Sequence, residues 1–351
     1  MSIRLGELVE RLGGQLTGDA DIEVTGIAPL DTANASHITF LSNSKFRAQA
    51  AQTQAAALIL SAADAAVIQP DYHGACIIAS NPYAYFARSA QLFVTLSEPA
   101  AVPGVHPSAI ISDSAHVASS ATIGPHVVVE ANASIGEHAI IGAGSFIGRD
   151  ARIGDGTRFH PRVTFYAACV IGQRGIVHSG AVIGADGFGF ANDGGEWVKI
   201  PQVGRVLIGD DVEIGANTTI DRGALADTVI EEGVKLDNQI QIAHNCHIGA
   251  HTAIAACAGI AGSATIGKYC SIGGAAMIHG HITIGDRVHV SAGTLAMRSI
   301  PEAGQYTGFY PVTKHGEWEK SAALVRNLPA LRERIRALEK TVKSFTENHD
   351  D

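Results

Sequence analysis

Apolar side chains recur every six residues over most of the chain. One block of this repeat runs from Val105 to Ile183 and a second from Ile208 to Val290, with four extra residues between Ile220 and Ile230. The residue after the apolar position is very often glycine, and the fifth residue of the hexad is usually small. This period fits neither an amphipathic helix nor the strict alternation of a half-buried strand.

The six-residue period is typical of a short strand followed by a tight turn, with three such units closing one triangular coil. One apolar residue of each strand then faces the interior, and the small residue fits beside it. Stacked coils bury a continuous core that no single coil could bury alone. The 28 hexads therefore predict a parallel β-helix over residues 101–308.

The segments that flank the repeat contain no hexads. Residues 1–100 mix helical and strand-like stretches and predict a small α/β domain, joined by the proline-rich linker 98–107. Residues 309–351 predict α-helices with a heptad seam, which would pack against a partner chain or against the protein's own scaffold. The seam consists of Leu328, Leu331, Ile335, Leu338, Val342 and Phe345.

Composition excludes several classes of function. The formal net charge of −9 disfavours nucleic acid or an anionic membrane as the main partner. The sequence contains no apolar run of membrane-spanning length, and its N-terminus does not resemble a signal peptide, so we expect a soluble, cytoplasmic protein. The five cysteines form no CxxC pair and are expected to be small apolar filler, with neither disulfides nor a metal site.

His244 stands out within the repeat, in the segment "DNQIQIAHNCHIGA" (237–250). Three hexads make one coil, so residues 18 apart stack on the same wall, about 4.8 Å apart along the axis. His244 occupies an outward position, and the same column then holds Gly262 and Gly280, the latter followed by His281. An imidazole beside a bare glycine leaves room for a substrate carbonyl next to a main-chain N–H, which makes this column a candidate catalytic site.

Two plainer interpretations of His244 stay open. The chain has 16 histidines, and many are expected to be exposed turn residues without a role. Some hexapeptide β-helices bind zinc through histidines of adjacent subunits, but the spacing of His244, His247 and His281 shows no convergence of three ligands.

Three segments, 186–224, 236–249 and 273–286, resemble the UDP-3-O-(3-hydroxyacyl)glucosamine N-acyltransferases of lipid A biosynthesis. The resemblance covers nearly the whole chain and is carried by strings such as "TTIDRGA", "LDNQIQIAHNCHIG" and "GGAAMIHGHITIGD". It implies a homotrimer of left-handed β-helices. Such a trimer transfers a 3-hydroxyacyl chain from acyl carrier protein to the 2-amino group of a UDP-sugar lipid precursor, without a cofactor.

The same resemblance implies roles for individual residues. His244 matches the general base, Gly262 the residue whose backbone N–H would stabilise the thioester oxyanion, and His281 a residue near the substrate phosphates. Asp237 and Asn245 lie in the same motif and are included as catalytic candidates.

Two further segments match by resemblance. In "FLSNSKFRAQ", Phe40 and Phe46 would sandwich the uracil, and Asn43 would read its polar edge. The family commonly has tyrosine where this chain has Phe46, so a hydroxyl contact is expected to be missing. Met297 and Arg298, at the end of the β-helix, are the expected contacts for the acyl chain and its carrier protein.

Two other functions are compatible with part of the sequence. A coenzyme-A-dependent UDP-sugar acyl- or acetyltransferase could use the same scaffold, and a related O-acyltransferase does, but the latter lacks a uridine-binding domain like 1–100. A purely structural β-helix would need neither the interruption at 185–207 nor the column that contains His244.

Overall fold

The computed structural model describes residues 2–99 and 101–347. The chain divides into two compact units, Met1–Ala100 and Ala101–Asp351. The side chain of Phe345, the last predicted heptad position, lies outside the described part of the chain.

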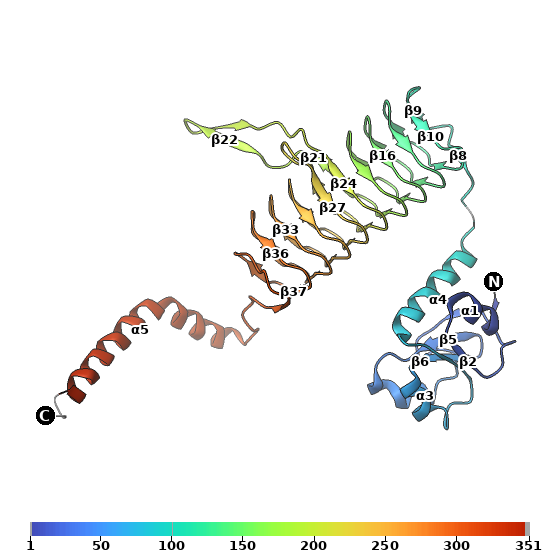
Figure 1. Cartoon of the computed structure of the whole chain (residues 1–351), viewed down its shortest axis with the longest axis horizontal. Helices are drawn as coiled ribbons and strands as arrows, with labels where there is room; N and C mark the ends of the chain where they lie inside the picture. The colour runs from blue at the N-terminus through green and yellow to red at the C-terminus, as the bar shows by residue number, and fades with distance from the viewer. Residues whose placement is uncertain (1, 100, 348–351) are drawn as a thin grey trace. The chain divides into compact units, whose positions relative to one another are not determined.

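The first unit is a five-stranded sheet with helices on both faces (Figure 1). Its strands, in spatial order, are β2 (Gln15–Thr17), β7 (Ala75–Ile78), β6 (Ala57–Leu60), β5 (His37–Phe40) and β4 (Gly26–Ile27). The helices are α1 (Leu5–Leu12), α2 (Arg47–Ala51), α3 (Ala62–Ile68) and α4 (Pro82–Ser97), with the 3-10 turn η1 (Ser44–Phe46). A separate antiparallel ladder joins β1 (Ile3–Arg4) to β3 (Glu23–Val24).

The central strand explains this layered arrangement. Every residue of β6 is apolar and buried, so both faces of the sheet must be covered. Leu8 of α1 and Tyr85 of α4 pack on one face, while Ala50 of α2 and Ile68 of α3 pack on the other. Because β5 and β6 run in parallel, their carboxyl ends lie at the same edge of the sheet, where the loop after β5 begins.

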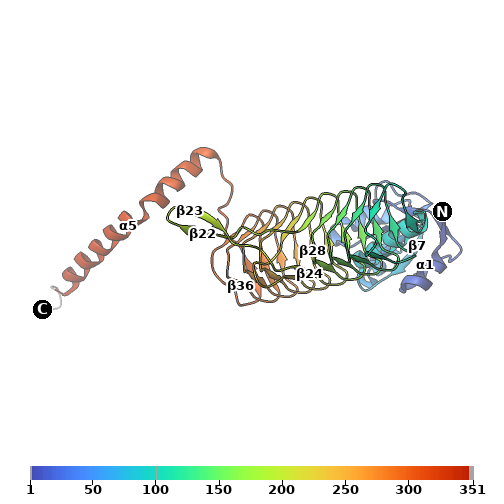
Figure 2. The same ribbon diagram turned by 90° about the horizontal axis from the view of Figure 1, so that it is seen from above.

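The second unit contains the predicted β-helix, whose coils are stacked in Figure 1 and seen along their length in Figure 2. Strands three apart along the chain pair in parallel and form three walls. Ile123, Ile141 and Phe159, for example, stand in register at the predicted spacing of 18 residues. All 28 predicted inward residues lie in strands.

The walls are defined by the following strands. The first wall contains β10 (His116–Val117), β13 (Ser134–Ile135), β16 (Arg152–Ile153), β19 (Val170–Ile171), β24 (Val206–Ile208), β27 (Thr228–Ile230), β30 (His247–Ile248), β33 (Thr265–Ile266) and β36 (Thr283–Ile284). The second contains β8 (Gly104–Val105), β11 (Thr122–Ile123), β14 (Ile140–Ile141), β17 (Arg158–Phe159), β20 (Ile176–Val177), β25 (Glu213–Ile214), β28 (Lys235–Leu236), β31 (Ala253–Ile254), β34 (Ser271–Ile272), β37 (Val288–Val290) and β39 (Gly304–Tyr306). The third contains β9 (Ile110–Ile111), β12 (Val128–Val129), β15 (Phe146–Ile147), β18 (Thr164–Phe165), β21 (Val182–Ala185), β26 (Thr219–Asp221), β29 (Gln241–Ile242), β32 (Gly259–Ile260), β35 (Met277–Ile278) and β38 (Leu295–Ala296).

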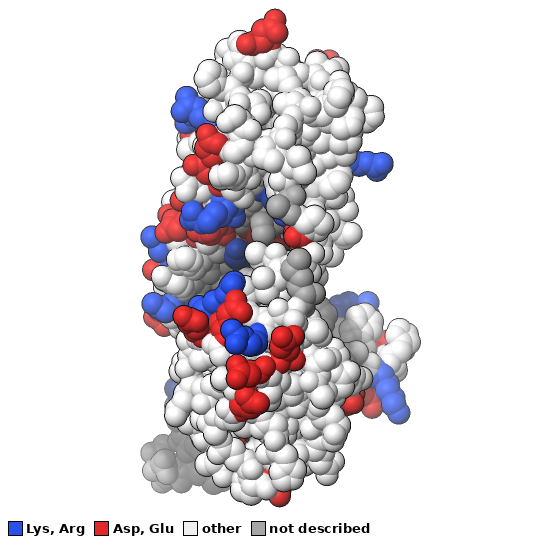
Figure 3. All heavy atoms as spheres, turned by 90° about the vertical axis from the view of Figure 1, so that its right-hand side faces the viewer, with Lys and Arg blue, Asp and Glu red and all other residues white. Residues whose placement is uncertain are grey.

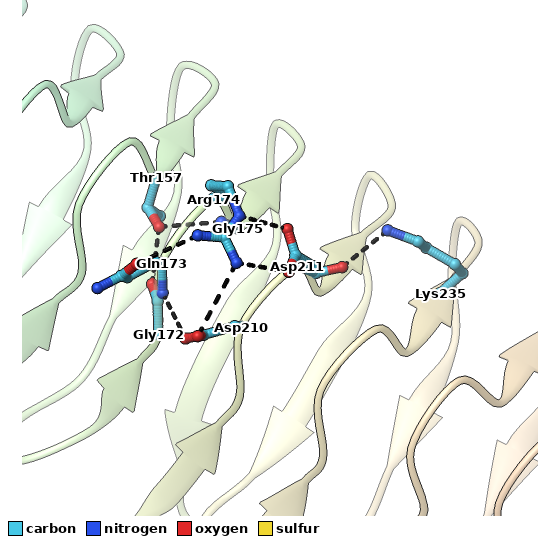
Figure 4. Close-up of polar contacts among 8 residues, drawn as sticks. All are labelled: Thr157, Gly172, Gln173, Arg174, Gly175, Asp210, Asp211 and Lys235. Carbon is cyan, nitrogen blue, oxygen red and sulfur yellow. Dashed lines mark hydrogen bonds and ion pairs between the residues drawn. The ribbon is translucent and has the colours of Figure 1, made fainter. Parts of the chain in front are cut away.

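Neighbouring coils are also tied at their corners, as Figure 4 shows. The guanidinium of Arg174 donates two hydrogen bonds of 2.7 Å to the carboxylate of Asp211 in the next coil. Lys235, one coil further, donates to the backbone carbonyl of Asp211 at 2.8 Å. Because these pairs are exposed, each contributes little to stability, and the backbone ladders carry the stack. On the face drawn in Figure 3, basic side chains lie among acidic ones.

Two features lie outside the regular hexads. Beyond Val290, the last apolar position of the repeat, the β-helix continues within its predicted range through β38 and β39, where the inward residue of β38 is the small Ala296. The interruption at 185–207 contains an antiparallel hairpin of β22 (Phe190–Asp193) and β23 (Glu196–Lys199), which projects from the coils (Figure 1).

Four of the five free cysteines are buried, as expected for small apolar filler, but Cys257 is exposed. That prediction is therefore wrong for Cys257, which occupies a turn with a φ of 62°.

The C-terminal residues form one long helix, α5 (His315–Glu347), with Pro329 inside it. Leu328, Ile335 and Leu338 of the predicted seam are each more than half exposed, so the described chain does not cover this face. Within the described residues, no helix is both long enough and apolar enough to cross a membrane.

The β-helix core supplies a test of stability. Phe159 is 1% exposed and packs edge-on against Phe165, with ring centroids 5.5 Å apart. We expect Phe159→Ala to lower the free energy of unfolding by about 3–5 kcal/mol, because the narrow coil cannot collapse around the cavity. Urea unfolding followed by circular dichroism measures this loss. Phe159→Leu should cost clearly less, and equal midpoints for both variants would contradict the packing argument.

Candidate active site

The predicted column is present on the third wall. His244 lies in the turn after β29, and its carbonyl accepts the N–H of Ser263 at 2.9 Å. One coil on, the carbonyl of Gly262 accepts the N–H of His281 at 3.1 Å. A methyl group built on Gly262 would lie 2.7 Å from both Cε1 and Nε2 of His244. The imidazole therefore lies against the bare backbone of Gly262.

Asn245 determines the tautomer of this imidazole, that is, which ring nitrogen carries the proton when the ring is neutral. Its Nδ2 donates to the carbonyl of Ala226 at 2.9 Å, and its Oδ1 accepts the N–H of Ala224 at 3.0 Å. These two backbone partners establish which end of the amide is the oxygen. Nδ1 of His244 lies 3.0 Å from that same oxygen, so Nδ1 must carry the proton in the neutral ring. Nε2 is then the unprotonated nitrogen, which can accept a proton.

Both interruptions of the repeat converge on His244. The insertion after Ile220 is held by Asn245, whose N–H also donates to Thr228 Oγ1 at 2.8 Å. From the interruption at 185–207, Gly187 approaches so closely that a methyl group on it would lie 2.6 Å from Cβ of His244 and 3.0 Å from Oε1 of Gln202. Gln202 is buried, and this oxygen accepts no hydrogen bond from a described residue.

Asp221, at the end of β26, is a residue that the sequence analysis missed. Its Oδ2 accepts a hydrogen bond of 3.0 Å from Nε2 of Gln241. Burial raises the pKa of this carboxyl group, while the Gln241 hydrogen bond and the nearby charge of His244 lower it. The available signal was its hexad position: Asp221 directly follows the inward Ile220, where most coils carry glycine or another small residue.

Small and apolar outward side chains lie on this wall in the coils after His244, together with the exposed His279. Gly259 forms part of its floor, and the sulfur of Met277 would lie 2.7 Å from a methyl group built there. Leu295 and Met297 are 56% and 58% exposed, and with Arg298 they line a hollow of about 700 Å³ at the end of the β-helix. A polar end at His244 thus continues into a surface that suits a hydrocarbon chain.

The structure does not bring every predicted residue to His244. Asp237 follows β28 at a different corner, where its carboxylate accepts the N–H groups of Asn238 at 2.8 Å and Ala256 at 3.0 Å. His247, on the first wall, pairs with Glu231 at 2.8 Å and does not join His244 and His281. Over residues 2–99 and 101–347, no cluster of three or more His, Cys, Asp or Glu residues suits a metal ion.

The first unit carries a second candidate site, a cavity of about 550 Å³ beside β5 and η1. Phe40, Asn43 and Phe46 all line it, as expected. Phe86 of α4 lines it too and stacks on Phe40 with ring centroids 4.1 Å apart, a contact that the sequence did not reveal. Phe46 is 51% exposed and stacks on no ring of the described residues. Asn43 Oδ1 caps η1 by accepting the N–H of Lys45 at 3.1 Å, which leaves its NH₂ group to face a ligand.

Comparison with known proteins agrees with this geometry. Residues 21–92 match the family of UDP-3-O-(3-hydroxymyristoyl) glucosamine N-acyltransferases, and residues 114–149 and 227–262 match the bacterial transferase hexapeptide repeat. The crystal structure of UDP-N-acetylglucosamine acyltransferase from Arabidopsis superposes with a TM-score of 0.54 at 19% identity, covering 58% of this chain and 71% of its own. That likeness concerns the fold alone.

The relatives in sequence are nearer. The UDP-3-O-acylglucosamine N-acyltransferase of Herminiimonas arsenicoxydans is 70% identical over 350 residues, which is 100% of both chains. That of Pseudomonas paraeruginosa is 53% identical over 100% of this chain and 98% of its own. The protein is therefore an acyltransferase built on a left-handed parallel β-helix of hexapeptide repeats. Within that class, the chain belongs to the UDP-3-O-acylglucosamine N-acyltransferase family.

The contact between His244 and Gly262 gives a direct test. Gly262→Ala places a methyl group where the imidazole lies, and a displacement of about 1 Å from the reactive position costs about 100-fold in rate. We expect acyl transfer to fall by about that factor while the thermal midpoint changes little. Gly316→Ala, where no atom lies within 4 Å of the added carbon, serves as the control. Full activity of the Gly262 variant would contradict the assignment.

Proposed function

We propose that this protein transfers a 3-hydroxyacyl chain from acyl carrier protein to the 2-amino group of UDP-3-O-acylglucosamine, a step of lipid A biosynthesis. The observation that carries the proposal is the contact of His244 Nδ1 with Asn245 Oδ1, which in the neutral ring makes Nε2 the proton acceptor, beside the backbone of Gly262. The relatives' names supply the acceptor sugar and the bond that is made.

His244 would act as the general base. The neutral amine attacks the thioester carbonyl and forms the C–N bond, and Nε2 of His244 takes the proton that the nitrogen must lose. The tetrahedral intermediate then breaks its C–S bond, and the protonated imidazole returns the proton to the departing thiolate. Asn245 would stabilise the transient imidazolium because its Oδ1 accepts from Nδ1 throughout.

Gly262 would stabilise the oxyanion. Its N–H donates to no described residue, and its missing side chain makes room for the imidazole of His244 beside it. A main-chain donor aimed at a developing negative charge is a typical contribution to acyl transfer. His281 follows in the next coil, in a turn with a φ of 60°, and its exposed imidazole would contact the phosphates of the sugar nucleotide.

The cavity lined by Phe40, Phe46 and Asn43 would bind the uracil of the acceptor. Its lining is apolar and aromatic, which suits a flat heterocycle, and the free NH₂ group of Asn43 would donate to a uracil carbonyl. The hydroxyl of Thr39 is buried at this cavity and has no hydrogen-bond partner among the described residues, which leaves a second group for a polar contact.

We propose a homotrimer, because a triangular coil has flat walls and a substrate cleft requires two of them. Large apolar side chains support this: Phe188 is 84% exposed and Trp197 is 70% exposed in the segment that includes the hairpin beside His244. The hollow of about 640 Å³ on the second wall contains Asp237, which would reach the site only from a neighbouring chain.

The acyl donor would be a carrier protein, whose acidic surface requires a local basic contact on a chain of net charge −9. Arg298 is exposed beside Met297 and forms no ion pair with a described residue, which supports its assignment to this role. We also propose a cytoplasmic location, consistent with five free cysteines.

The function is tested by mass spectrometry of the product formed from 3-hydroxyacyl carrier protein and UDP-3-O-acylglucosamine. The wild type should add one acyl chain through an amide, and His244→Ala should lower kcat by about two to four orders of magnitude. His251→Ala, which alters an exposed turn histidine, should turn over normally. Near-normal turnover of the His244 variant would remove His244 from the chemistry. If a coenzyme A thioester were used as efficiently as the carrier protein, coenzyme A would replace the carrier protein as the proposed donor.

Uracil binding is tested by titration with UDP alone. Each of Phe40→Ala and Phe46→Ala should weaken UDP binding by about 5- to 150-fold, the equivalent of about 1–3 kcal/mol for a lost stack. Val67→Ala, an exposed position on α3 outside the cavity, should bind UDP normally. UDP binding unchanged in both phenylalanine variants would move the uridine site elsewhere.

A further inference from the structure

We propose that Asp221 receives the amino group of the acceptor in its ammonium form and thereby selects amine acceptors over hydroxyl acceptors. This inference rests on the proposed function, because it takes the acceptor to be a 2-amino sugar. In this scheme Asp221 recognises the amine first, and His244 removes a proton from it afterwards.

Asp221 is the last residue of β26. It lies on the third wall, where β26 pairs with β29, the strand that leads into His244. The pairing of β21 with β26 shifts register between Ile183 and Ala185, at Gly184, whose φ is 90°. This irregularity lies in the neighbouring strand of the same wall, directly beside Asp221, whose register partner is Ala185.

Asp221 forms no salt bridge with a described lysine or arginine. The adjacent Arg222 directs its guanidinium away, to the carbonyls of Gly184 at 2.9 Å and Ala167 at 2.6 Å. Gln241 donates to one carboxylate oxygen of Asp221, and no described residue donates to the other. A part-buried carboxylate with one vacant acceptor and no ion pair therefore stands on the wall that carries His244.

The electrostatics favour a cationic ligand here. Burial raises the pKa of Asp221, because removal from water makes the ionised carboxylate less favourable relative to the protonated form. Two titratable groups interact with it, namely His244 and the thiol of Cys246, whose pKa is raised to about 11 chiefly by burial and further by the charge of Asp221. A bound ammonium would stabilise the carboxylate, whereas a hydroxyl brings no compensating charge.

The proton balance of the reaction agrees with this role. The acceptor arrives as R–NH₃⁺ with one N–H donating to Asp221, and it releases one proton to water to become R–NH₂. That amine attacks the thioester, gives its second proton to Nε2 of His244, and the thiolate leaves with that proton as a thiol. The net products are the amide, the free thiol and one proton in water, and Asp221 stays ionised throughout.

The experiment compares acceptor binding in the wild type and in Asp221→Asn, which keeps the size of the side chain and removes its charge. The probes are UDP-3-O-acylglucosamine and its 2-hydroxy counterpart, UDP-3-O-acylglucose, the latter measured as a competitive inhibitor. We expect the wild type to bind the amine about 10- to 100-fold more tightly than the hydroxyl compound, the range for a charged hydrogen bond. Asp221→Asn should bring the ratio close to one and leave UDP binding unchanged.

Two further variants separate charge from structure. Asp221→Glu keeps the carboxylate and should retain most of the preference for the amine, whereas Asp150→Asn removes an exposed carboxylate in an earlier coil and should leave the ratio unaltered. An Asp221→Asn protein that still prefers the amine overturns the inference. If that variant does not fold, a wild type that binds both compounds equally overturns it instead. A wild type that fails to acylate the amine refutes the proposed function, which is a different result.

Discussion

The backbone pairing of each coil with the next is the constraint on which this structure depends. Parallel strands pair at a spacing of 18 residues, so side chains far apart in sequence stand one above another in columns. What a residue can do is therefore determined by the residues 18 positions away. His244 has a bare backbone beside it because Gly262 occupies that position, and His281 follows because its N–H binds the carbonyl of Gly262.

A regular β-helix has flat walls, and the chemistry arises where the repeat is broken. The hairpin segment at 185–207 and the insertion after Ile220, which both precede His244 in the sequence, both approach it. Asn245 links the insertion to the imidazole. Its side chain binds the insertion through the backbone of Ala224 and Ala226, and the same amide oxygen contacts Nδ1 of His244. Loss of that amide would thus disturb the loop and the tautomer together.

The two units contribute different kinds of recognition. The first presents an aromatic cavity, in which the stack of Phe86 on Phe40 fixes the ring that a flat ligand would contact. The second presents a wall that carries Asp221 and His244, with the exposed apolar side chains of Met277, Leu295 and Met297 further along. An aromatic cavity suits a flat heterocycle, and exposed apolar side chains suit a hydrocarbon chain.

The amino-acid sequence by itself determined the β-helix, the inward residue of every hexad and the column of His244 with Gly262. It could do so because a strict period converts positions in sequence directly into positions in space. It did not reveal Asp221, the contact of Phe86 with Phe40 or the exposure of Cys257. It also could not distinguish two carboxylates that directly follow an inward residue: Asp237 accepts backbone N–H groups at another corner, whereas Asp221 lies on the wall of His244. Only the tertiary structure decided these points, because the interruptions and the first unit have no period, and where their side chains fold back depends on packing rather than on spacing.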